Sequence, residues 1–511
     1  MALINLVDCL AVSSFLYLFV AFCDNGRRGG HSYPPGPPPW PIVGNLLDVP
    51  KEAPWAAYAN MSKKYGDVIC LRVLGQVVVV LCSLSAVKEL LEKRGETYAD
   101  RPALPILECA LLSPFGWLLP TSRKNETWRE GRKLLDRSLR PGATISYRQM
   151  MQENTHRFLA QLLATPRDFR GHIEAGKFVM SLTYGYDLKD GDTMISAPVQ
   201  AVEILSRLIL PGAALVNHLP FLRHVPSWVP FLSYKPLARI GKELSDKMKN
   251  EPIDFVKNAM RDGTAVQSMA SEHLREVENL PSSMRHRHEE IIKVAMGSIF
   301  SGTVSSMSSF FLALVLFPRV QRRAQEELDV AIGRDRLPTF DDRKRLPYLE
   351  AFCKELLRWR MVTPLAVPHA SIENDVYKDF FIPKGATIVA NAWAILHDSE
   401  TYPDPEDFKP ERFLDKDGSF RDDPALGLVF GCGKRICPGR HFVDATLFIV
   451  ISSVLSVFNV TKAKDKSGHD IPVNAAMTVH SGIVVHPEKF ECSIAPRDYI
   501  AEDLILANSL S

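Results

Sequence analysis

The sequence has no excess of charge of either sign. Lysine and arginine total 61 residues, aspartate and glutamate total 59, and the formal net charge is +2. No long basic or acidic run occurs. Nucleic acids and acidic partners attract proteins through clustered charge, so the charge pattern indicates neither. With 46% apolar and 23% charged residues, the composition is that of an ordinary globular protein.

Paired cysteines and repeats are also missing. The nine cysteines are scattered and mostly lie in apolar surroundings, so we expect no disulfide framework and a reducing compartment. The chain has no internal repeat and no low-complexity tract beyond a proline cluster near residue 36. No Gly-x-Gly-x-x-Gly motif follows a strand pattern, so no flavin or nicotinamide site is expected.

The N-terminus carries a long apolar run. Residues 2–23 are mostly apolar, and about 20 such residues suffice to cross a bilayer as a helix. A cleaved signal peptide is the alternative, but no basic residue precedes the run, whereas Arg27 and Arg28 follow it. The charge asymmetry predicts a membrane anchor over 1–24 with the rest of the chain in the cytoplasm.

Prolines follow the predicted anchor. Residues 34–41 contain six of them, which favours a stiff, extended segment. We therefore divide the chain into an anchor, a proline-rich linker over 25–45 and one body over 46–511. The stretch 218–232 is apolar and rich in proline, so an exposed loop that dips into the membrane is expected there.

The body is predicted to be mainly α with a minor β part. Residues 68–82 indicate two strands around Gly75, and shorter strands are expected within 375–391 and 473–486. Helical patterns occur at 56–65, 84–93, 125–140, 147–164, 197–209, 236–260, 348–360 and 441–455.

A longer helix is predicted over 288–317. The segment contains no proline and Pro318 follows it. At 1.5 Å per residue it would be about 45 Å long. A second membrane span is the alternative reading, but the segment contains many serines and has Lys293 near its start.

The stretch FGCGKRICPGR, residues 430–440, resembles neither a helix nor a strand. Its glycines allow a tight loop, and Lys434 and Arg435 would favour a thiolate at Cys437. The start of the helix that follows would act in the same direction. An iron–sulfur or zinc site would need further cysteine or histidine ligands nearby. A single thiolate with positive neighbours suits the axial ligand of haem iron.

The same residues resemble a known signature. Phe430, Gly433, Arg435, Cys437 and Gly439 match Phe-x-x-Gly-x-Arg-x-Cys-x-Gly of the cytochrome P450 family. The resemblance covers essentially the whole chain and is closest to microsomal fungal enzymes of specialised metabolism. It implies the cytochrome P450 fold, haem b as cofactor and Cys437 as the ligand of its iron.

Other motifs of this family occur in the expected order. Glu355 and Arg358 form a Glu-x-x-Arg pair on one helix face, which the resemblance joins to Arg412 of a Pro-Glu-Arg-Phe element in a structural ion-pair network. Trp128 and Arg132 match Trp-x-x-x-Arg. The resemblance implies that these two residues, together with His369 and Arg435, contact the haem propionates.

The chain departs from the family above the haem. The family places an acid and an alcohol on the long helix, but no Asp or Glu occurs between Glu290 and Glu326. In one alignment Val304 replaces the acid and Ser305 is the alcohol; in the other, about four residues are missing and Thr303 is the alcohol. We therefore expect protons to pass through Thr303 or Ser305 and water, since a hydroxyl both donates and accepts.

The resemblance implies a monooxygenase. It would take electrons from an NADPH-cytochrome P450 reductase at the endoplasmic reticulum membrane. The apolar stretch 102–119, together with Leu365, Ala366 and Val367, predicts an apolar small-molecule substrate, for example a terpenoid or polyketide. Two alternatives stay open: a haem-thiolate isomerase or dehydratase, and a non-catalytic haem-binding protein.

Overall fold

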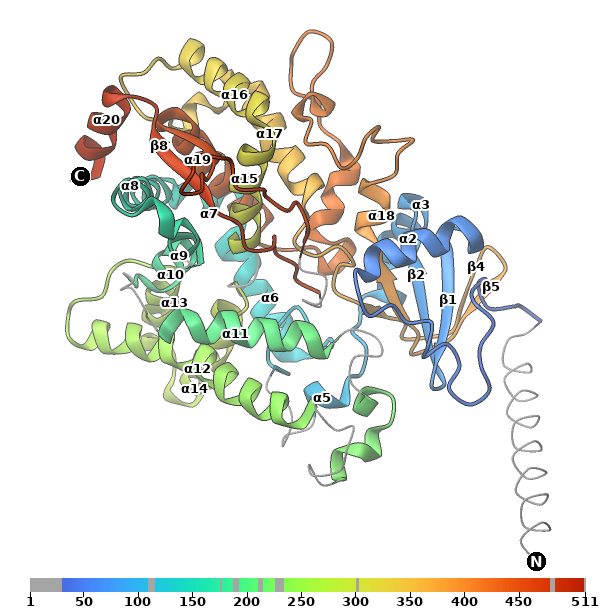
Figure 1. Cartoon of the computed structure of the whole chain (residues 1–511). Coiled ribbons are helices and arrows are strands. Elements are labelled where there is room, and N and C mark those ends of the chain that lie inside the picture. The colour runs from blue at the N-terminus through green and yellow to red at the C-terminus, as the bar shows by residue number, and fades with distance from the viewer. Residues whose placement is uncertain are drawn as a thin grey trace, which may run out of the picture.

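A small β-region lies beside a larger helical body, at the right and left of the view in Figure 1. The anchor predicted over 1–24 and the first part of the linker lie outside the residues that the structure describes. This computed structural model describes residues 30–108, 115–174, 177–186, 193–209, 215–225, 234–299, 303–477 and 483–509.

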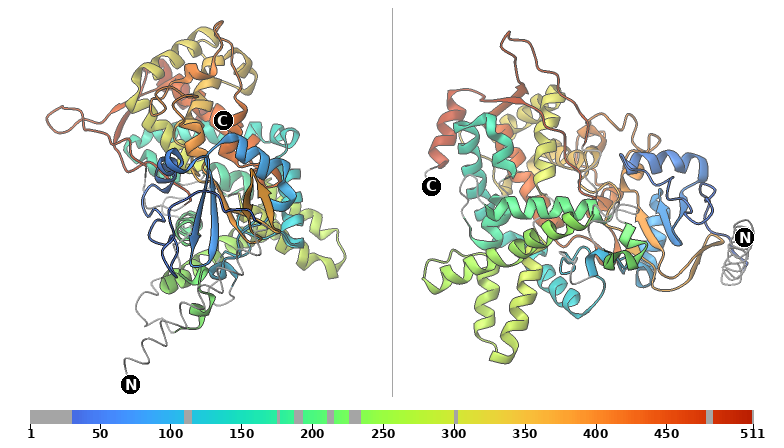
Figure 2. Two further views of the ribbon diagram at one scale, coloured as in Figure 1. Left: turned by 90° about the vertical axis from the view of Figure 1, so that its right-hand side faces the viewer. Right: turned by 60° about the horizontal axis from the view of Figure 1, so that its bottom comes forward.

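The main sheet joins segments from opposite halves of the chain. Its strands follow the order β1-β2-β6-β3, in which β2 and β6 are parallel and the other pairs are antiparallel. The left view of Figure 2 shows blue strands from early in the chain beside orange strands from late in it. The bounds are β1 (Val68–Val73), β2 (Gln76–Leu81), β3 (His369–Ala370) and β6 (Thr387–Ala390), with β4 (Asp375–Tyr377) and β5 (Phe380–Ile382) in a second sheet and β7 (Phe458–Lys462) and β8 (Cys492–Pro496) in a third.

Helices make up most of the body. The longer ones are α2 (Pro54–Tyr65), α6 (Glu126–Leu139), α8 (Arg148–Ala164), α11 (Thr193–Leu208), α12 (Tyr234–Arg261), α13 (Met269–Glu278), α14 (Ser282–Gly297), α15 (Thr303–Leu316), α16 (Pro318–Ala331), α17 (Pro347–Trp359), α19 (Arg440–Val457) and α20 (Tyr499–Ser509). The shorter ones are α3 (Leu84–Val87), α4 (Gly95–Tyr98), α5 (Pro105–Glu108), α7 (Pro141–Ser146), α9 (Phe169–Glu174), α10 (Lys177–Tyr184) and α18 (Ala392–Leu396).

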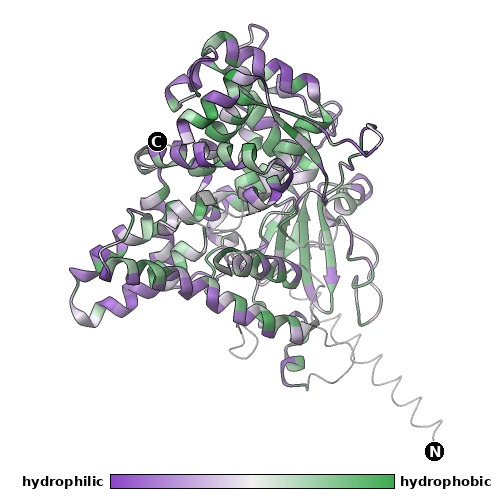
Figure 3. Cartoon of the chain, turned by 60° about the vertical axis from the view of Figure 1, so that its left-hand side comes forward, coloured by the Kyte–Doolittle hydropathy of each residue, from purple (hydrophilic) through white to green (hydrophobic). Residues whose placement is uncertain are grey.

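The centre of the body is apolar. Helix α19 packs against α8, α16 and α17, and most of its residues are buried. Figure 3 shows the strands and inner helices coloured mainly as hydrophobic, whereas the outer helices alternate. Among the described residues, α19 alone is long and apolar enough to span a bilayer, but 72% of it is buried inside the protein. Its hydropathy is therefore that of a core helix.

The hydrophobic periodicity located most helices well. The helices expected at 125–140, 147–164 and 348–360 are confirmed as α6, α8 and α17. The two strands around Gly75 are confirmed as β1 and β2. The pattern at 84–93 is divided, because α3 continues as a π-helical turn over Lys88–Lys93.

The prediction of one helix over 288–317 is wrong. Helix α14 begins earlier and ends at Gly297, and α15 begins at Thr303. Two contacts lie at the end of α14. A Cβ at Gly297 would lie 2.8 Å from the Trp117 ring, and the Ser298 hydroxyl donates to Val294 while it accepts the N–H of Leu119. The segment around Trp117 is therefore packed against the point where the helix ends.

The strand expected within 473–486 is also absent from the described part of that stretch. Residues 473–477 and 483–486 form no strand, although Met477 makes an isolated bridge to Pro487. Conversely, α13, α16 and α20 form where no helix was predicted. These three helices are short or strongly polar on one side, which weakens their apolar pattern.

Candidate functional site

Cys437 lies in a tight loop that leads into α19. The N–H of Cys437 donates to the carbonyl of Phe430 at 2.7 Å, which closes the loop on itself. Gly431 and Gly433 have φ angles of +80° and +56°, in a region that favours glycine. A Cβ at Gly433 would lie 2.1 Å from the carbonyl oxygen of Leu91. The two glycines thus fix the path that brings Cys437 to the start of the helix.

The protein alone favours a neutral thiol at this position. Burial raises the pKa of Cys437 above its ordinary value, and the Gly439 N–H and the charges of Arg132 and Arg440 oppose that rise without reversing it. A bound metal ion deprotonates a coordinating thiol outright. A metal ion at the sulfur atom of Cys437 would therefore supply the positive charge that a thiolate needs.

The basic side chains beside Cys437 in the sequence, Lys434 and Arg435, bind other parts of the protein. Lys434 forms an ion pair with Glu96. Arg435 donates from Nε to the carbonyl of Ala99 (2.7 Å) and from Nη1 to that of Ser122 (3.0 Å). The prediction that these two side chains favour the thiolate is corrected, because the cations that favour it are Arg132 and Arg440.

Arg435 is buried with part of its hydrogen-bonding capacity unused. Its guanidinium lies 4.0 Å from the centre of the Trp128 ring. Nη2 has no hydrogen-bond partner and lies 3.8 Å from Asp100. Burial lowers the pKa of Arg435 to about 10. An acidic ligand that accepted a hydrogen bond from Nη2 would replace the hydrogen bond to water that this nitrogen loses on burial.

A second buried arginine, Arg101, was not predicted from the sequence. Its Nη1 donates to the carbonyls of Val367 (2.7 Å) and Pro368 (2.8 Å), and its Nε has no partner. Burial and the nearby charge of Arg435 lower the pKa of Arg101 to about 9. The one signal in the sequence was a charged side chain at the start of an apolar stretch, which is common on protein surfaces.

His369 and Arg132 complete the group. The Nδ1 of His369 lies 2.8 Å from the carbonyl of Tyr98, to which it donates. Burial and the two buried arginines hold the pKa of His369 well below its ordinary value, so the imidazole is neutral. Arg132 pairs through Nε with both carboxylate oxygens of Asp136 at 3.0 Å, one helical turn further on α6.

These side chains form what we call the cation cluster: Arg101, Arg132, His369 and Arg435, with Trp128 beside them. Among the described residues, Arg101 forms no ion pair, and Asp100 is the carboxylate that faces the cluster. Asp100 also pairs with Arg123 (3.2 Å) and accepts the N–H of Lys124. Asp136 pairs with Arg132, and Asp100 is shared between Arg435 and Arg123, which leaves Arg101 without an ion pair in the described part of the chain. The cluster is therefore suited to hold an anionic ligand.

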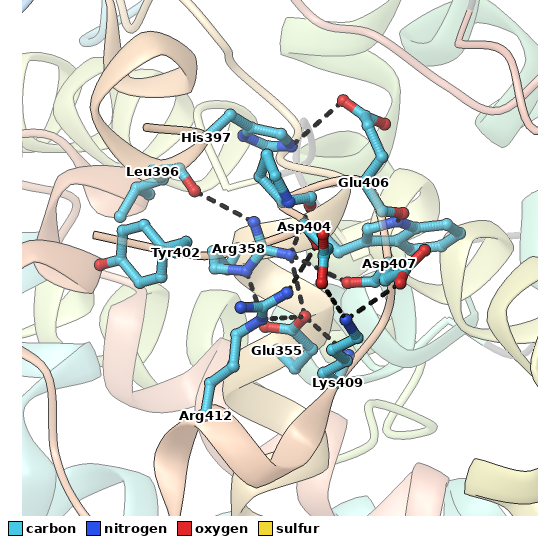
Figure 4. A network of polar contacts seen from close by, with 12 residues as sticks. Glu355, Arg358, Leu396, His397, Tyr402, Asp404, Glu406, Asp407, Lys409 and Arg412 are labelled. Carbon is cyan, nitrogen blue, oxygen red and sulfur yellow. Dashed lines mark hydrogen bonds and ion pairs between the residues drawn. The ribbon is translucent and has the colours of Figure 1, made fainter. Parts of the chain in front are cut away.

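The predicted ion pair lies in a separate network, shown in Figure 4. Arg358 donates from Nε and Nη2 to the two oxygens of Glu355 at 2.7 and 2.8 Å, and neither side chain is exposed. Its Nη1 donates to the carbonyl of Leu396. Arg412 lies 3.4 Å from Glu355, and the N–H of Lys409 also donates to that carboxylate. We call these residues the Glu355 network.

The two alcohols predicted to carry protons are placed unequally. The side chain of Thr303 lies outside the part of the chain that the structure describes, as do Ser301 and Gly302. Ser305 is buried in the first turn of α15, and its hydroxyl donates to the carbonyl of Val485 at 2.6 Å. The structure thus gives Ser305 a definite partner on the C-terminal segment.

The apolar wall is described in part. Residues 109–114 of the stretch 102–119 lie outside the described residues. Leu365 and Ala366 are buried and Val367 is partly buried. Leu365 belongs to the apolar cluster on β1 and β2, together with Val485. The contacts of this segment with the cation cluster are made by the backbone carbonyls of Val367 and Pro368, which accept hydrogen bonds from Arg101.

Comparison with known proteins agrees with this arrangement. A sequence model of the cytochrome P450 family matches residues 34–493. Cytochrome P450 monooxygenase 208 of Postia placenta is 37% identical over 97% of this chain and 96% of its own length. Cytochrome P450 monooxygenase claR of Ampulloclitocybe clavipes is 37% identical over 93% and 88%. Tryptamine 4-monooxygenase of Psilocybe cyanescens is 36% identical over 93% and 95%.

Proposed function

The chain belongs to the cytochrome P450 family, and on that premise we propose that it is a membrane-anchored monooxygenase that oxidises an apolar small molecule. The enzyme class and the cofactor, haem b, follow from the family. The proposed reaction is hydroxylation, and the proposed substrate is a terpenoid or polyketide of fungal specialised metabolism. The fungal monooxygenases to which the chain is similar support this direction.

One observation supports the site most strongly. Cys437 is a partly buried thiol whose pKa is raised by desolvation, and the cation cluster contains two buried arginines, Arg101 and Arg435, that each have a nitrogen without a hydrogen-bond partner among the described residues. Haem supplies a partner to both, because its iron is a cation and its propionates are carboxylates. The same ligand therefore completes two incomplete parts of one site, which fits the donor set that the chain presents.

The residues have separate roles in this proposal. Cys437 ligates the iron, and Phe430, Gly433 and Gly439 shape the loop that presents its sulfur. When bound, a haem with a thiolate ligand supplies the activation of dioxygen. The propionates are held by the cation cluster and Trp128, and Arg101 is our addition to the residues predicted from the sequence.

Proton delivery falls to a hydroxyl in the first turn of α15. The segment contains no acid, so Thr303 Oγ1 or Ser305 Oγ would pass the proton from water. Because the Ser305 hydroxyl donates its proton to a backbone carbonyl, we assign the relay to Thr303.

Electrons come from outside the chain. We propose an NADPH-cytochrome P450 reductase as the donor, with both proteins on the endoplasmic reticulum membrane. The apolar run over 1–24 would anchor the chain, the linker over 25–45 would follow it, and the catalytic body over 46–511 would lie in the cytoplasm. No nucleic acid is expected to take part.

Two other functions compete with this one because the acid is missing. A haem-thiolate isomerase or dehydratase would convert a peroxide without NADPH. A non-catalytic haem protein would consume neither oxygen nor peroxide. Oxygen-dependent NADPH consumption with a reductase, together with a product that carries one added oxygen atom, would support the monooxygenase and exclude both alternatives.

The assignment of Cys437 is tested by replacement. Cys437→Ala should abolish the reduced carbon monoxide band that marks haem-thiolate proteins. Cys432→Ala is the matched control, because Cys432 is buried in the same loop, where burial raises its pKa to about 12. The control should keep the band, and a normal band in Cys437→Ala would exclude the proposed ligand.

A further inference from the structure

The contact between Ser305 and Val485 joins two distant segments. Ser305 lies in the first turn of α15 and is 1% exposed. Val485 lies 180 residues further along the chain, in the segment 483–486 that precedes β8. The hydroxyl donates to the carbonyl at 2.6 Å, so its only proton is directed to backbone.

Val485 is held from a second side as well. Its N–H donates to the carbonyl of Val362 at 2.9 Å, just after the end of α17. Its side chain is 1% exposed and packs in the same apolar cluster as Leu365. Both backbone groups and the side chain of one residue therefore tie α15 to the segment 362–365.

That segment continues into the wall of the site. Arg101 binds the carbonyls of Val367 and Pro368, and His369 follows at the cation cluster. The spacing between α15 and this wall is thus set at one end by the bond from Ser305 to Val485. If the hydroxyl is removed, the Val485 carbonyl stays buried without its partner, which is unfavourable.

We propose that Ser305 is a positioning residue, which holds the segment 483–486 against α15 and fixes the shape of the substrate-binding region. This inference rests on the proposed function for the location of the substrate. It replaces a proton-relay role for Ser305, because a relay hydroxyl must be free to exchange its proton with water or substrate.

The test compares replacements at Ser305 with a control on the same helix. Ser309 lies one turn further along α15, is fully buried, and its hydroxyl has no hydrogen-bond partner among the described residues. Ser305→Ala and Ser309→Ala therefore remove the same atom at similar burial. Ser305→Thr and Ser305→Val form a second pair, of nearly equal size, that differ in the hydroxyl alone.

The first readout does not depend on activity. Hydrogen–deuterium exchange followed by mass spectrometry on a peptide that covers 483–490 reports on the Val485 N–H. Exchange should be about tenfold faster in Ser305→Ala and Ser305→Val, as expected for the loss of one buried hydrogen bond. It should stay near wild type in Ser305→Thr and Ser309→Ala.

The second readout uses 4-phenylimidazole as a probe of the haem-loaded protein. If Ser305 is a positioning residue, Ser305→Ala and Ser305→Val should bind the probe more weakly, with a higher Kd in a spectral titration. The solvent isotope effect on turnover should not change. If Ser305 relays protons, the Kd of the probe should stay the same and the solvent isotope effect should change. Unchanged exchange in Ser305→Val, or equal acceleration in Ser309→Ala, would overturn the proposal, whereas failure of the proposed function would instead appear as loss of the haem-thiolate spectrum in the wild type.

Discussion

The Glu355 network and the cation cluster both contain buried arginines, but they differ in how these arginines are paired with carboxylates. In the Glu355 network every nitrogen of Arg358 donates to an acceptor of the chain itself. In the cation cluster Nε of Arg101 and Nη2 of Arg435 have no hydrogen-bond partner. The Nε of Arg412 in the first network also has no hydrogen-bond partner, but it lies 3.4 Å from the Glu355 carboxylate, which carries the opposite charge. Arg101 has no such ion pair among the described residues, and we propose that an anionic ligand supplies it.

The pKa shifts of the two groups differ in the same way. This distinction between charges that stabilise the fold and charges proposed to bind a ligand does not depend on comparison with similar proteins. Burial raises the pKa of Glu355, and the two hydrogen bonds from Arg358 act in the opposite direction. Burial lowers the pKa of Arg101, and the charge of Arg435 acts in the same direction. The unfavourable surroundings of Arg101 agree with the proposed anionic ligand, because a negative charge beside it would act in the opposite direction.

The largest expected effect is in the complete network. Glu355→Ala should lower the free energy of unfolding by about 3–5 kcal/mol, because it leaves Arg358 buried without its carboxylate. The loss should be similar with and without haem, as measured by denaturant unfolding and by the yield of soluble protein.

Glu406→Ala is the control for that prediction. Glu406 pairs with Arg360 at 3.0 Å but its side chain is 61% exposed. The Arg360 side chain is 10% exposed, but without Glu406 it keeps its bonds to the carbonyls of Trp359 and Ala475. We therefore expect Glu406→Ala to cost under about 1 kcal/mol. A Glu355→Ala protein as stable as Glu406→Ala would contradict the structural role of the network.

A smaller effect is expected in the cation cluster, where a substitution should weaken haem binding and leave the stability of the haem-free protein nearly unchanged. Arg101→Met removes the charge and keeps most of the apolar stem. Haem retention should fall about 10- to 100-fold, as expected for the loss of one hydrogen bond to a charged group. The haem-free protein should lose little stability, since the substitution also removes an unbalanced buried charge.

Arg101→Lys serves as the comparison for that variant, because it keeps the charge but has one donor nitrogen in place of three. It should retain haem better than Arg101→Met in a transfer assay with apomyoglobin as acceptor. Equal haem loss from the two variants would mean that the bonds to Val367 and Pro368 matter and the charge does not.

The smallest expected effect concerns pH. His397 adjoins the Glu355 network, and burial and the charges of Arg358 and Arg360 lower its pKa to about 3. Below pH 6.5 the unfolded chain therefore binds a proton that the folded chain does not. From pH 7.5 to 5.5 this histidine should lower the free energy of unfolding by about 1.4 kcal/mol.

His397→Leu should remove that part of the acid sensitivity, both with and without haem. His469→Leu is the control, because the His469 side chain is 82% exposed. His369 should behave differently, since propionates beside it would raise its pKa. Acid sensitivity from His369 should thus be greater in the haem-free protein, and denaturant midpoints at the two pH values would detect the difference.

The features that could be predicted from the sequence are those that local residue spacing determines. The glycine spacing around Cys437 and the i, i+3 spacing of Glu355 and Arg358 are local, and the structure has the expected loop and ion pair. The i, i+4 spacing of Trp128 and Arg132 places both on α6. Local periodicity therefore accounts for most helices and for the ion pair.

What sequence reasoning missed depends on contacts between distant segments. Arg101 is part of the cluster because the chain brings residue 367 to it, and no pattern near residue 101 contains that information. The end of α14 at Gly297 lies against the Trp117 ring, which comes from a different segment. The bond between Ser305 and Val485 has the same origin. Tertiary packing determined these features.

Residues that bond to one another in the cation cluster are far apart in the sequence, and this determines when the cluster can form during synthesis. His369 binds the carbonyl of Tyr98 across 271 residues, and Arg435 binds that of Ala99 across 336. At roughly 5–20 residues per second, about 20 to 70 s of synthesis separates the two ends of the longer contact. A nascent chain therefore has no place to seat the cofactor until its last segments are made. Haem can be held by the cluster only after nearly the whole chain has been synthesised.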